Sequence, residues 1–235
     1  MDHQDIYKND KVCVISYNSR GFSEIKTDFI NFLLSDTVNG DKIPILCNQE
    51  NVMLRQNSYR LKKALPDYQL LINPAVKKDL SKGRPSNGMF IAFPESIKNQ
   101  VTDVSPGFWR LQAVKIKFMT STLLLINSYF PTDPQRDNAD NAELLETLGY
   151  IKQIIDVNDS DTILWAGDIN SDFSRHSNHT VAVQDAQQDI GFHVAWDQFD
   201  ADFTCSHEVL GQTFTSLLDN FFWNTEFRPS NLLHF

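Results

Sequence analysis

Short apolar runs that predict strands alternate along the chain with stretches whose apolar residues have helical spacing. β-branched and aromatic residues dominate the strand-like runs, which cover 12–18, 43–50, 68–72, 89–93, 109–118, 121–130, 163–170, a segment near 203 and 217–223. The tight turn at 119–120 predicts a hairpin. Apolar residues three or four apart predict helices over 22–34, 58–65, 139–157 and about 181–190.

Strands outnumber helices in this pattern, and the helices lie between strands. This mixture favours an α/β (α+β) fold with sheets packed on each other and helices outside. The 235 residues contain no repeat, low-complexity segment or Pro/Gly-rich linker, which predicts one domain over 1–235. Hydrophobic residues make up 41% and charged residues 22% of the chain, which excludes a disordered class.

Composition also bears on where the protein works. No apolar run approaches the roughly 18 residues that span a bilayer, and the first residues lack a signal-peptide pattern. Three cysteines cannot all pair within the chain, and Cys13 and Cys47 lie in strand-like runs, as expected of buried thiols in a reducing compartment. We therefore expect a soluble protein of the nucleus or cytoplasm with no membrane partner.

The charge balance admits two kinds of partner. A formal net charge of −9 is unusual for a nucleic-acid binder and suits a protein that gathers carboxylates around a divalent cation. Residues 55–84, by contrast, contain eight Lys and Arg against two Asp. This segment is either a local basic face or an ordinary solvated surface.

Polar residues of one kind end or interrupt five of the predicted strands. The run 163–170 closes with Gly-Asp-x-Asn, which marks either a site or an Asp/Asn turn. Because sites form where strand ends converge, we expect the polar groups of these strands to share a pocket. The groups are Asn18, Glu50, Asn127, Tyr129, Asp168, Asn170 and Asp219.

Carboxylates and amides without histidine or cysteine suit a hard cation such as Mg²⁺ or Mn²⁺. No Ser-His-Asp, Cys-His or zinc spacing competes, and His176 and His179 are interpreted as solvated loop residues. The matching chemistry is metal-assisted attack of water on a phosphoester.

Each polar side chain has a predicted part in that reaction. Asp168 would align or deprotonate the water. Asn170 and Asn18 would hold the phosphate and the ligands in register. Tyr129 would donate to a phosphate oxygen or to the leaving oxygen.

Taken in order, these residues resemble the endonuclease/exonuclease/phosphatase family. Within it they are most similar to the endonuclease domains of LINE-type (non-LTR) retrotransposons, which are related to apurinic/apyrimidinic endonucleases. The ordered series is specific, although no single member of it is. The matching motifs are Asn18, Gln49-Glu50, Gly83-Arg84 with Asn87-Gly88, Tyr129-Phe130-Pro131, Gly167-Asp168-Ile169-Asn170 and Ser216-Leu217-Leu218-Asp219, over about 12–224.

The resemblance implies a deoxyribonuclease-like, four-layered sandwich of two central mixed β-sheets packed face to face and flanked by helices. It implies Mg²⁺ as cofactor, with Mn²⁺ as an alternative, and DNA as partner. The implied catalytic residues are Glu50, Tyr129, Asp168, Asn170 and Asp219; Glu50 and Asn18 would hold the metal; and Arg84, Asn87, Asn127 and Ser216 would contact the substrate or DNA. Residues 204–216 would correspond to a loop that probes the DNA groove.

Three positions depart from the family pattern. Asn87-Gly88 replaces the usual Gly-Gly, and Thr132 stands where several relatives have Asn. The sequence ends at Phe235 before the family's Asp-His motif, and His234 lies in an apolar context that does not favour a catalytic role. We expect a truncated or degenerate protein and little activity from the 235-residue form.

Three functional hypotheses stay open. The first is a Mg²⁺-dependent DNA endonuclease that nicks target DNA for retrotransposition, expected as a monomer and as part of a longer polyprotein with reverse transcriptase. The second is a phosphatase or phosphodiesterase of the same fold that acts on inositol phosphates or nucleotide substrates. The third is an inactive remnant that only binds DNA or a partner.

Overall fold

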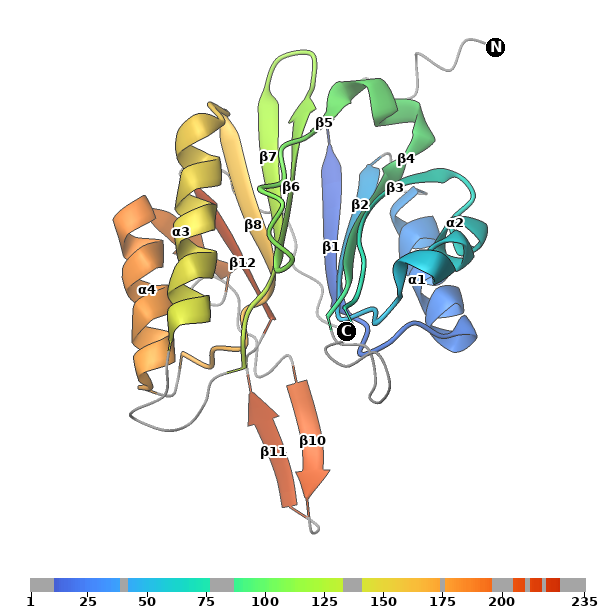
Figure 1. Ribbon diagram of the computed structural model, residues 1–235. Helices are drawn as coiled ribbons and strands as arrows, with labels where there is room; N and C mark the ends of the chain where they lie inside the picture. Colours follow the sequence, from blue (N-terminus) through green and yellow to red (C-terminus); the bar gives the residue numbers. More distant parts are fainter. Residues whose placement is uncertain are drawn as a thin grey trace.

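Helices and sheets form four layers in the order helix, sheet, sheet, helix (Figure 1). The computed structural model describes residues 11–38, 42–76, 87–132, 141–173, 176–195, 205–209, 212–216 and 219–224. No helix among these residues is both long and apolar enough to cross a membrane.

The first sheet has the strand order β1-β2-β4-β3. β1 (Val12–Asn18) and β2 (Ile43–Gln49) run parallel, so they end at the same edge. β4 (Met89–Pro94) pairs antiparallel with β2 and with β3 (Tyr68–Asn73). The sheet is therefore mixed.

The second sheet is also mixed, with the strand order β5-β6-β7-β8-β12-β9. β7 and β8 run parallel, and the other described neighbours are antiparallel. The strands are β5 (Val101–Asp103), β6 (Leu111–Lys117), β7 (Thr122–Tyr129), β8 (Thr162–Asp168), β12 (Asp219–Asn224) and β9 (Phe192–Val194). β6 and β7 form the predicted hairpin.

Helices cover the outer face of each sheet. α1 (Glu24–Val38) and α2 (Tyr59–Ala64) lie against the first sheet, and α3 (Ala142–Val157) and α4 (Asn178–Ile190) lie against the second (Figure 1). Two 3₁₀ turns, η2 (Arg55–Asn57) and η3 (Glu95–Gln100), connect elements of the first half. The helices stand within a few residues of the ranges that the apolar spacing predicted, although α4 begins three residues earlier, at Asn178.

The alternation of side chains along β2 explains the layering. Successive residues of a strand point to opposite faces, so Ile45 and Cys47 pack between the two sheets while Leu46 packs under α1 and α2. Both faces of β2 are buried, which is why its sequence is a nearly continuous apolar run.

A separate two-stranded hairpin completes the described elements. β10 (Cys205–Val209) and β11 (Gln212–Ser216) pair antiparallel. Figure 1 shows this hairpin extending from the edge of the sheets at which β7 and β8 end. The apolar pattern predicted neither this hairpin nor the three-residue strands β5 and β9, while the strand expected near 203 lies outside the described residues.

Candidate active site

Four strand ends meet at one edge of the molecule. Asn18 ends β1 beside the end of β2, and Tyr129 ends β7 opposite Asp168, the last residue of β8. The two sheets are joined here by a hydrogen bond from the Asn18 Nδ2 to the Asp168 Oδ2, 2.6 Å long. Residues 150 positions apart in sequence thus form one polar cluster at this edge.

The Asp168 carboxyl lies in a largely desolvated place, with the residue only 5% exposed. Burial raises the pKa of Asp168 from its usual 3.8 to about 6, and the charge of Glu50 adds to this rise. Hydrogen bonds from Asn18 and from the Asn170 backbone N–H, with the charge of Arg20, lower it in part. The carboxyl is therefore more basic than an exposed aspartate.

The phenol of Tyr129 belongs to the same electrostatic environment. Burial raises the pKa of Tyr129 to about 12, with further increases from the charges of Glu50 and Asp168, while Arg110 and Arg20 act in the opposite direction. The phenol therefore keeps its proton at neutral pH and can donate a hydrogen bond.

Backbone strain gathers at the ends of the strands. Arg20, Glu50 and Asn170 all adopt positive φ angles, of 44°, 51° and 47°. Such a conformation costs a non-glycine residue about 1 kcal/mol or more, and it persists where the surroundings enforce it. Here the Gly21 N–H donates to the Glu50 carbonyl at 2.7 Å, and the Asn170 N–H donates to the Asp168 carboxylate at 3.0 Å.

Gly167 has a steric reason to precede Asp168. Its φ is 144°, and a Cβ at this position would lie 2.0 Å from the Ser128 carbonyl oxygen. Any larger residue would push β7 and β8 apart at their common end. The glycine of the Gly-Asp-x-Asn motif thus sets how close Asp168 comes to β7.

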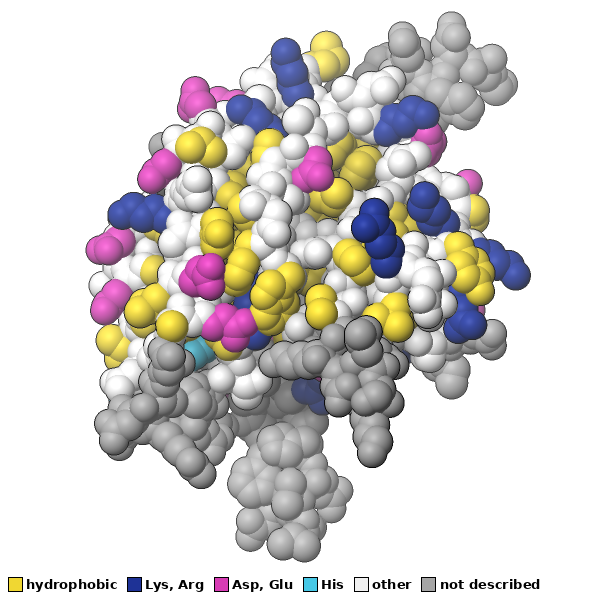
Figure 2. Space-filling model, viewed as in Figure 1, with side chains coloured by type: hydrophobic (Ala, Val, Ile, Leu, Met, Phe, Trp, Pro, Cys, Tyr) yellow, Lys and Arg dark blue, Asp and Glu magenta, His cyan; other side chains and the backbone are white. Residues whose placement is uncertain are grey.

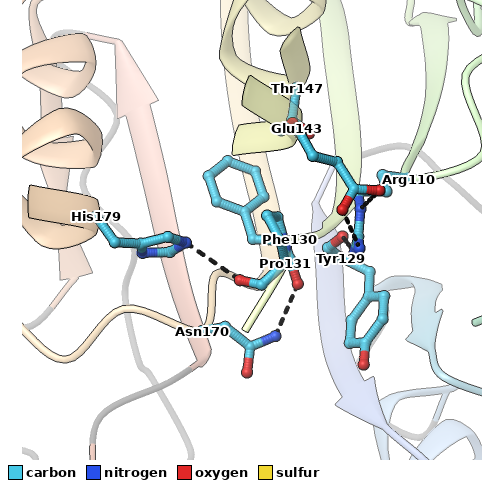
Figure 3. A network of polar contacts seen from close by, with 8 residues as sticks. All are labelled: Arg110, Tyr129, Phe130, Pro131, Glu143, Thr147, Asn170 and His179. Carbon is cyan, nitrogen blue, oxygen red and sulfur yellow. Dashed lines mark hydrogen bonds and ion pairs between the residues drawn. The ribbon is translucent and has the colours of Figure 1, made fainter. Parts of the chain in front are cut away.

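Arg110 anchors the backbone of Tyr129 from the side of α3. Its Nη1 donates to the Tyr129 carbonyl at 2.9 Å, and its guanidinium forms an ion pair with Glu143 through Nε, at 3.0 Å, and Nη2, at 3.1 Å (Figure 3). The Tyr129 N–H in turn donates to the Arg110 carbonyl. The sequence interpretation missed this residue; an isolated arginine at the entry of an apolar strand was the signal for it.

His179 is not a solvated loop residue, contrary to the prediction. It is 2% exposed in the first turn of α4, with its Nε2 3.1 Å from the Pro131 carbonyl and its Nδ1 2.6 Å from the Ser171 Oγ. Because a carbonyl only accepts, Nε2 carries the proton and Nδ1 accepts from Ser171. Asn170 makes a parallel link, from Nδ2 to the Phe130 carbonyl at 2.8 Å (Figure 3).

These two contacts tie together the segments that follow β7 and β8. A further bond runs from the Phe130 N–H to the Asp168 carbonyl, 2.8 Å long. Figure 3 shows the Asn170 side-chain oxygen directed away from Phe130 and the Tyr129 hydroxyl directed away from Arg110. The Arg110 contact thus fixes the backbone of Tyr129, and the Phe130 contact fixes the side-chain amide of Asn170. The Tyr129 hydroxyl and the Asn170 side-chain oxygen both point away from these partners.

Asn127, predicted to contact substrate, lies instead in the interior between the two sheets. It is fully buried, accepts from the Gln49 Nε2 at 2.7 Å and donates toward the Gln112 Oε1 and the Asn48 carbonyl, each at 3.3 Å. Asn127 and Tyr129 share one face of β7, but only Tyr129 reaches the edge. Asn127 therefore joins the sheets beneath the polar cluster.

The remaining predicted residues lie around this edge or outside the described part. Asn87 has a φ of 69°, and its carbonyl accepts from the Val52 N–H, two residues after Glu50. Asp219 stands opposite Asp168 in the β12–β8 register, while Ser216 ends β11. Arg84 lies outside the described residues.

The donor set at the edge fits a hard cation. Glu50 and Asp168 place two mutually repelling carboxylates near the Asn18 amide, and oxygen ligands of this kind suit Mg²⁺, which keeps several of its own waters. Over the described ranges, no three or more His, Cys, Asp and Glu gather as a denser metal cluster. The oxygen donors of Glu50, Asp168 and Asn18 are of the kind that a divalent cation takes.

Solved structures provide the comparison. An endonuclease/exonuclease/phosphatase family protein from Leptotrichia buccalis is 15% identical, with a TM-score of 0.60 over 91% of this chain and 88% of that one. This chain has the endonuclease/exonuclease/phosphatase fold. The endonuclease domain of TRAS1, a telomere-specific non-LTR retrotransposon, is 14% identical, with a TM-score of 0.61 over 91% of this chain and 85% of that one.

A third structure extends the likeness within this fold. TDP2 from D. rerio, complexed with a single-strand DNA product, is 17% identical, with a TM-score of 0.61 over 94% of this chain and 87% of that one. No family model and no curated protein sequence matches the chain. The predicted fold is confirmed, since two mixed sheets flanked by helices are shared with these endonuclease/exonuclease/phosphatase structures.

Proposed function

We propose that the chain hydrolyses phosphodiester bonds of DNA with the help of Mg²⁺, as an endonuclease. The observation that carries the proposal is the Asn18–Asp168 hydrogen bond. It brings the strand ends of both sheets together and places Glu50 and Tyr129 within electrostatic reach of the same carboxylate. A structural core has no use for such an arrangement of buried charge.

Asp168 is the residue best suited to accept a proton from water. A pKa near 6 leaves it ionised at neutral pH while making it a stronger base than an exposed aspartate. Asn18 binds one carboxylate oxygen and the Asn170 N–H binds the other, so the carboxylate has a fixed orientation. That orientation is the preorganisation a general base requires.

Tyr129 and Asn170 are the proposed phosphate contacts. The phenol stays protonated, so it can donate to a phosphate oxygen or to the leaving oxygen. Asn170 keeps one amide hydrogen on the Phe130 carbonyl, which fixes the plane of its side chain. Arg20 contributes positive charge, since it lowers the pKa of both Asp168 and Tyr129.

Glu50 is the proposed ligand of the metal, with Asn18 beside it. The Asn18 Oδ1 accepts from the Arg20 N–H at 2.9 Å and retains a second lone pair. When bound, Mg²⁺ would supply positive charge that stabilises the phosphoryl oxygens and the leaving group. Mn²⁺ accepts the same oxygen ligands and is the alternative.

The comparisons support DNA as the substrate. One neighbour is named as a retrotransposon endonuclease domain, and another was solved with a single-strand DNA product. We extend this to the present chain as a nick in target DNA. The basic stretch within 55–84 adds a source of phosphate contacts on the same chain.

The proposal is tested by nicking of supercoiled plasmid in Mg²⁺, with the chain in excess so that slow turnover is detected. We expect nicking that is abolished by EDTA, and a loss of about 10²–10⁴ in rate for Asp168→Asn. Asp161→Asn is the matched control, because it makes the same change on an exposed side chain just before the other end of β8. Mn²⁺ binding, measured by calorimetry, should weaken in Glu50→Gln.

Three results would contradict the proposal. Nicking that persists in EDTA would exclude the metal, and equal rates for the two aspartate variants would exclude Asp168. Hydrolysis of an inositol phosphate without any nicking of DNA would instead favour a phosphatase of the same fold.

A further inference from the structure

The side chain of Trp109 lies next to Arg110, which also packs against the ring of Tyr129 in the proposed site. The guanidinium carbon of Arg110 is 3.9 Å from the centre of the Trp109 ring and 5.5 Å from that of Tyr129. The arginine thus contacts both rings, and a single side chain separates the indole from the phenol. Trp109 is itself partly exposed.

The Trp109 ring rests on a rigid support. Arg110 is held by Glu143 and by the Tyr129 carbonyl, so the face that it presents to the indole is fixed. On the other side in sequence, Phe108 stacks on Tyr150 of α3, with ring centres 4.9 Å apart. A tight turn, closed by the Leu111 N–H on the Phe108 carbonyl at 3.1 Å, holds Trp109 between these anchors.

Trp109 differs from the two tryptophans of the core. Trp165 and Trp223 are 0% and 1% exposed, and the Trp165 Nε1 donates to the Ser128 Oγ. Figure 2 shows hydrophobic side chains gathered on the face between α3 and the strands of the β6–β7 hairpin. Partly exposed members of this region include Val104, Phe108, Trp109 and Tyr150.

We infer that Trp109 is a stacking platform for a nucleobase next to the phosphodiester held at Asp168. The inference rests on the proposed function and deepens it, because it selects a substrate that has an aromatic base. Base–aromatic stacking is independent of sequence, since every base has a π-face. A preformed indole loses little conformational freedom on binding, which adds to its suitability as a platform.

Binding of a labelled single-stranded pentadeoxynucleotide tests the platform directly. Fluorescence anisotropy in EDTA measures affinity without hydrolysis. We expect Trp109→Leu to raise the Kd about 5- to 100-fold, and Trp109→Phe to raise it less than about threefold, because only the phenylalanine keeps a ring. Phe32→Leu removes an exposed ring from α1 and should leave the Kd unchanged; Phe32 is 59% exposed.

A set of pentanucleotides, each with one abasic position, supplies the second arm. In the wild-type chain, removal of the base that stacks on Trp109 should weaken binding by the same factor as Trp109→Leu. In Trp109→Leu, removal of the same base should not raise the Kd further, since the substitution and the base removal delete the same contact. Circular dichroism confirms that each variant is folded before its Kd is compared.

The inference is overturned if Trp109→Leu and Trp109→Phe bind the pentanucleotide with the same Kd. It is also overturned if each abasic position raises the Kd of the wild type and of Trp109→Leu by the same factor. Hydrolysis of bis(p-nitrophenyl) phosphate by the wild-type chain in Mg²⁺ reports on the proposed function separately, because this substrate has no nucleobase. Its absence would reject the proposed function, while the anisotropy data would still decide on the platform.

Discussion

Removing the charge of Asp168 should change the stability of the metal-free protein in a pH-dependent way. Burial raises the pKa of this carboxyl from 3.8 to about 6. Between these values the folded chain holds a proton that the unfolded chain has released. The contribution of Asp168 to the free energy of unfolding therefore falls as the pH rises from about 4 to 7. Asp168→Asn has no such dependence at this position.

The magnitude follows from the size of the pKa change. At about 1.4 kcal/mol per pKa unit, a rise of about two units corresponds to a loss of about 2–3 kcal/mol for the wild type over this interval. Asparagine has one acceptor oxygen where the carboxylate has two, one for Asn18 and one for the Asn170 N–H. One of these donors loses its partner, at a cost of about 1–2 kcal/mol.

Together, the two effects predict that the difference in the free energy of unfolding between Asp168→Asn and the wild type changes sign between pH 4 and pH 7. At pH 4 the variant should be less stable than the wild type by about 1–2 kcal/mol, because only the lost hydrogen bond counts. At pH 7 it should be as stable or more stable by about 1 kcal/mol, because the wild type then carries a buried charge. Other carboxylates titrate in both proteins and cancel in the comparison.

Urea unfolding in EDTA at pH 4, 5, 6 and 7 measures this difference, with the fluorescence of the buried Trp165 and Trp223 contributing to the signal. Asp185→Asn, at an exposed position of α4, controls for the chemistry of the substitution. A difference between Asp168→Asn and the wild type that stays constant with pH would refute the burial of this charge. If the variant instead became less stable relative to the wild type as the pH rose, the folded protein would stabilise Asp168 as an anion.

Three further substitutions test how the polar cluster is supported, each by urea unfolding at pH 7. Gly167→Ala should lower stability by about 2–5 kcal/mol, because its Cβ would meet the Ser128 carbonyl and its φ is positive; a loss below 1 kcal/mol would contradict that close approach. His179→Ala should cost about 2–3 kcal/mol, since the buried Ser171 hydroxyl and the partly buried Pro131 carbonyl each lose a hydrogen bond, and unchanged stability would show that the imidazole is not engaged. Asn127→Leu should cost about 2–4 kcal/mol because it removes the shortest acceptor of the Gln49 amide, and a loss below 1 kcal/mol would show that this contact contributes little to joining the sheets.

The pattern of apolar residues was sufficient to predict the long elements. α3 and the β6–β7 hairpin lie within a few residues of their expected ranges, because each buries one face and so repeats its apolar residues with a definite period. β5 and β9 have three residues each, too few for any period to show. The hairpin β10–β11 gave no apolar signal that separated it from a loop.

The prediction for His179, made from its neighbours in sequence alone, was wrong. Its polar neighbours suggested a loop, and the helix was expected to begin near 181. Instead Ser177 caps α4 by accepting from the Thr180 N–H, so the helix begins at Asn178 and turns His179 inward. The contacts with the Ser171 hydroxyl and the Pro131 carbonyl then stabilise the imidazole, which was predicted to be solvated.

Sequence by itself determined which residue types stand at the strand ends, since Asn18, Glu50, Tyr129 and Asp168 each close an apolar run. Only the tertiary structure decided which of them meet. Asn18 and Asp168 belong to different sheets, and a contact across 150 residues leaves no trace in local periodicity. The packing of the two sheets also determined that Asn127 is buried and joins the sheets, whereas Tyr129, two residues later on the same face of β7, reaches the edge. Strand period fixes the face of a residue, but the packing of one sheet on the other fixes its distance from water.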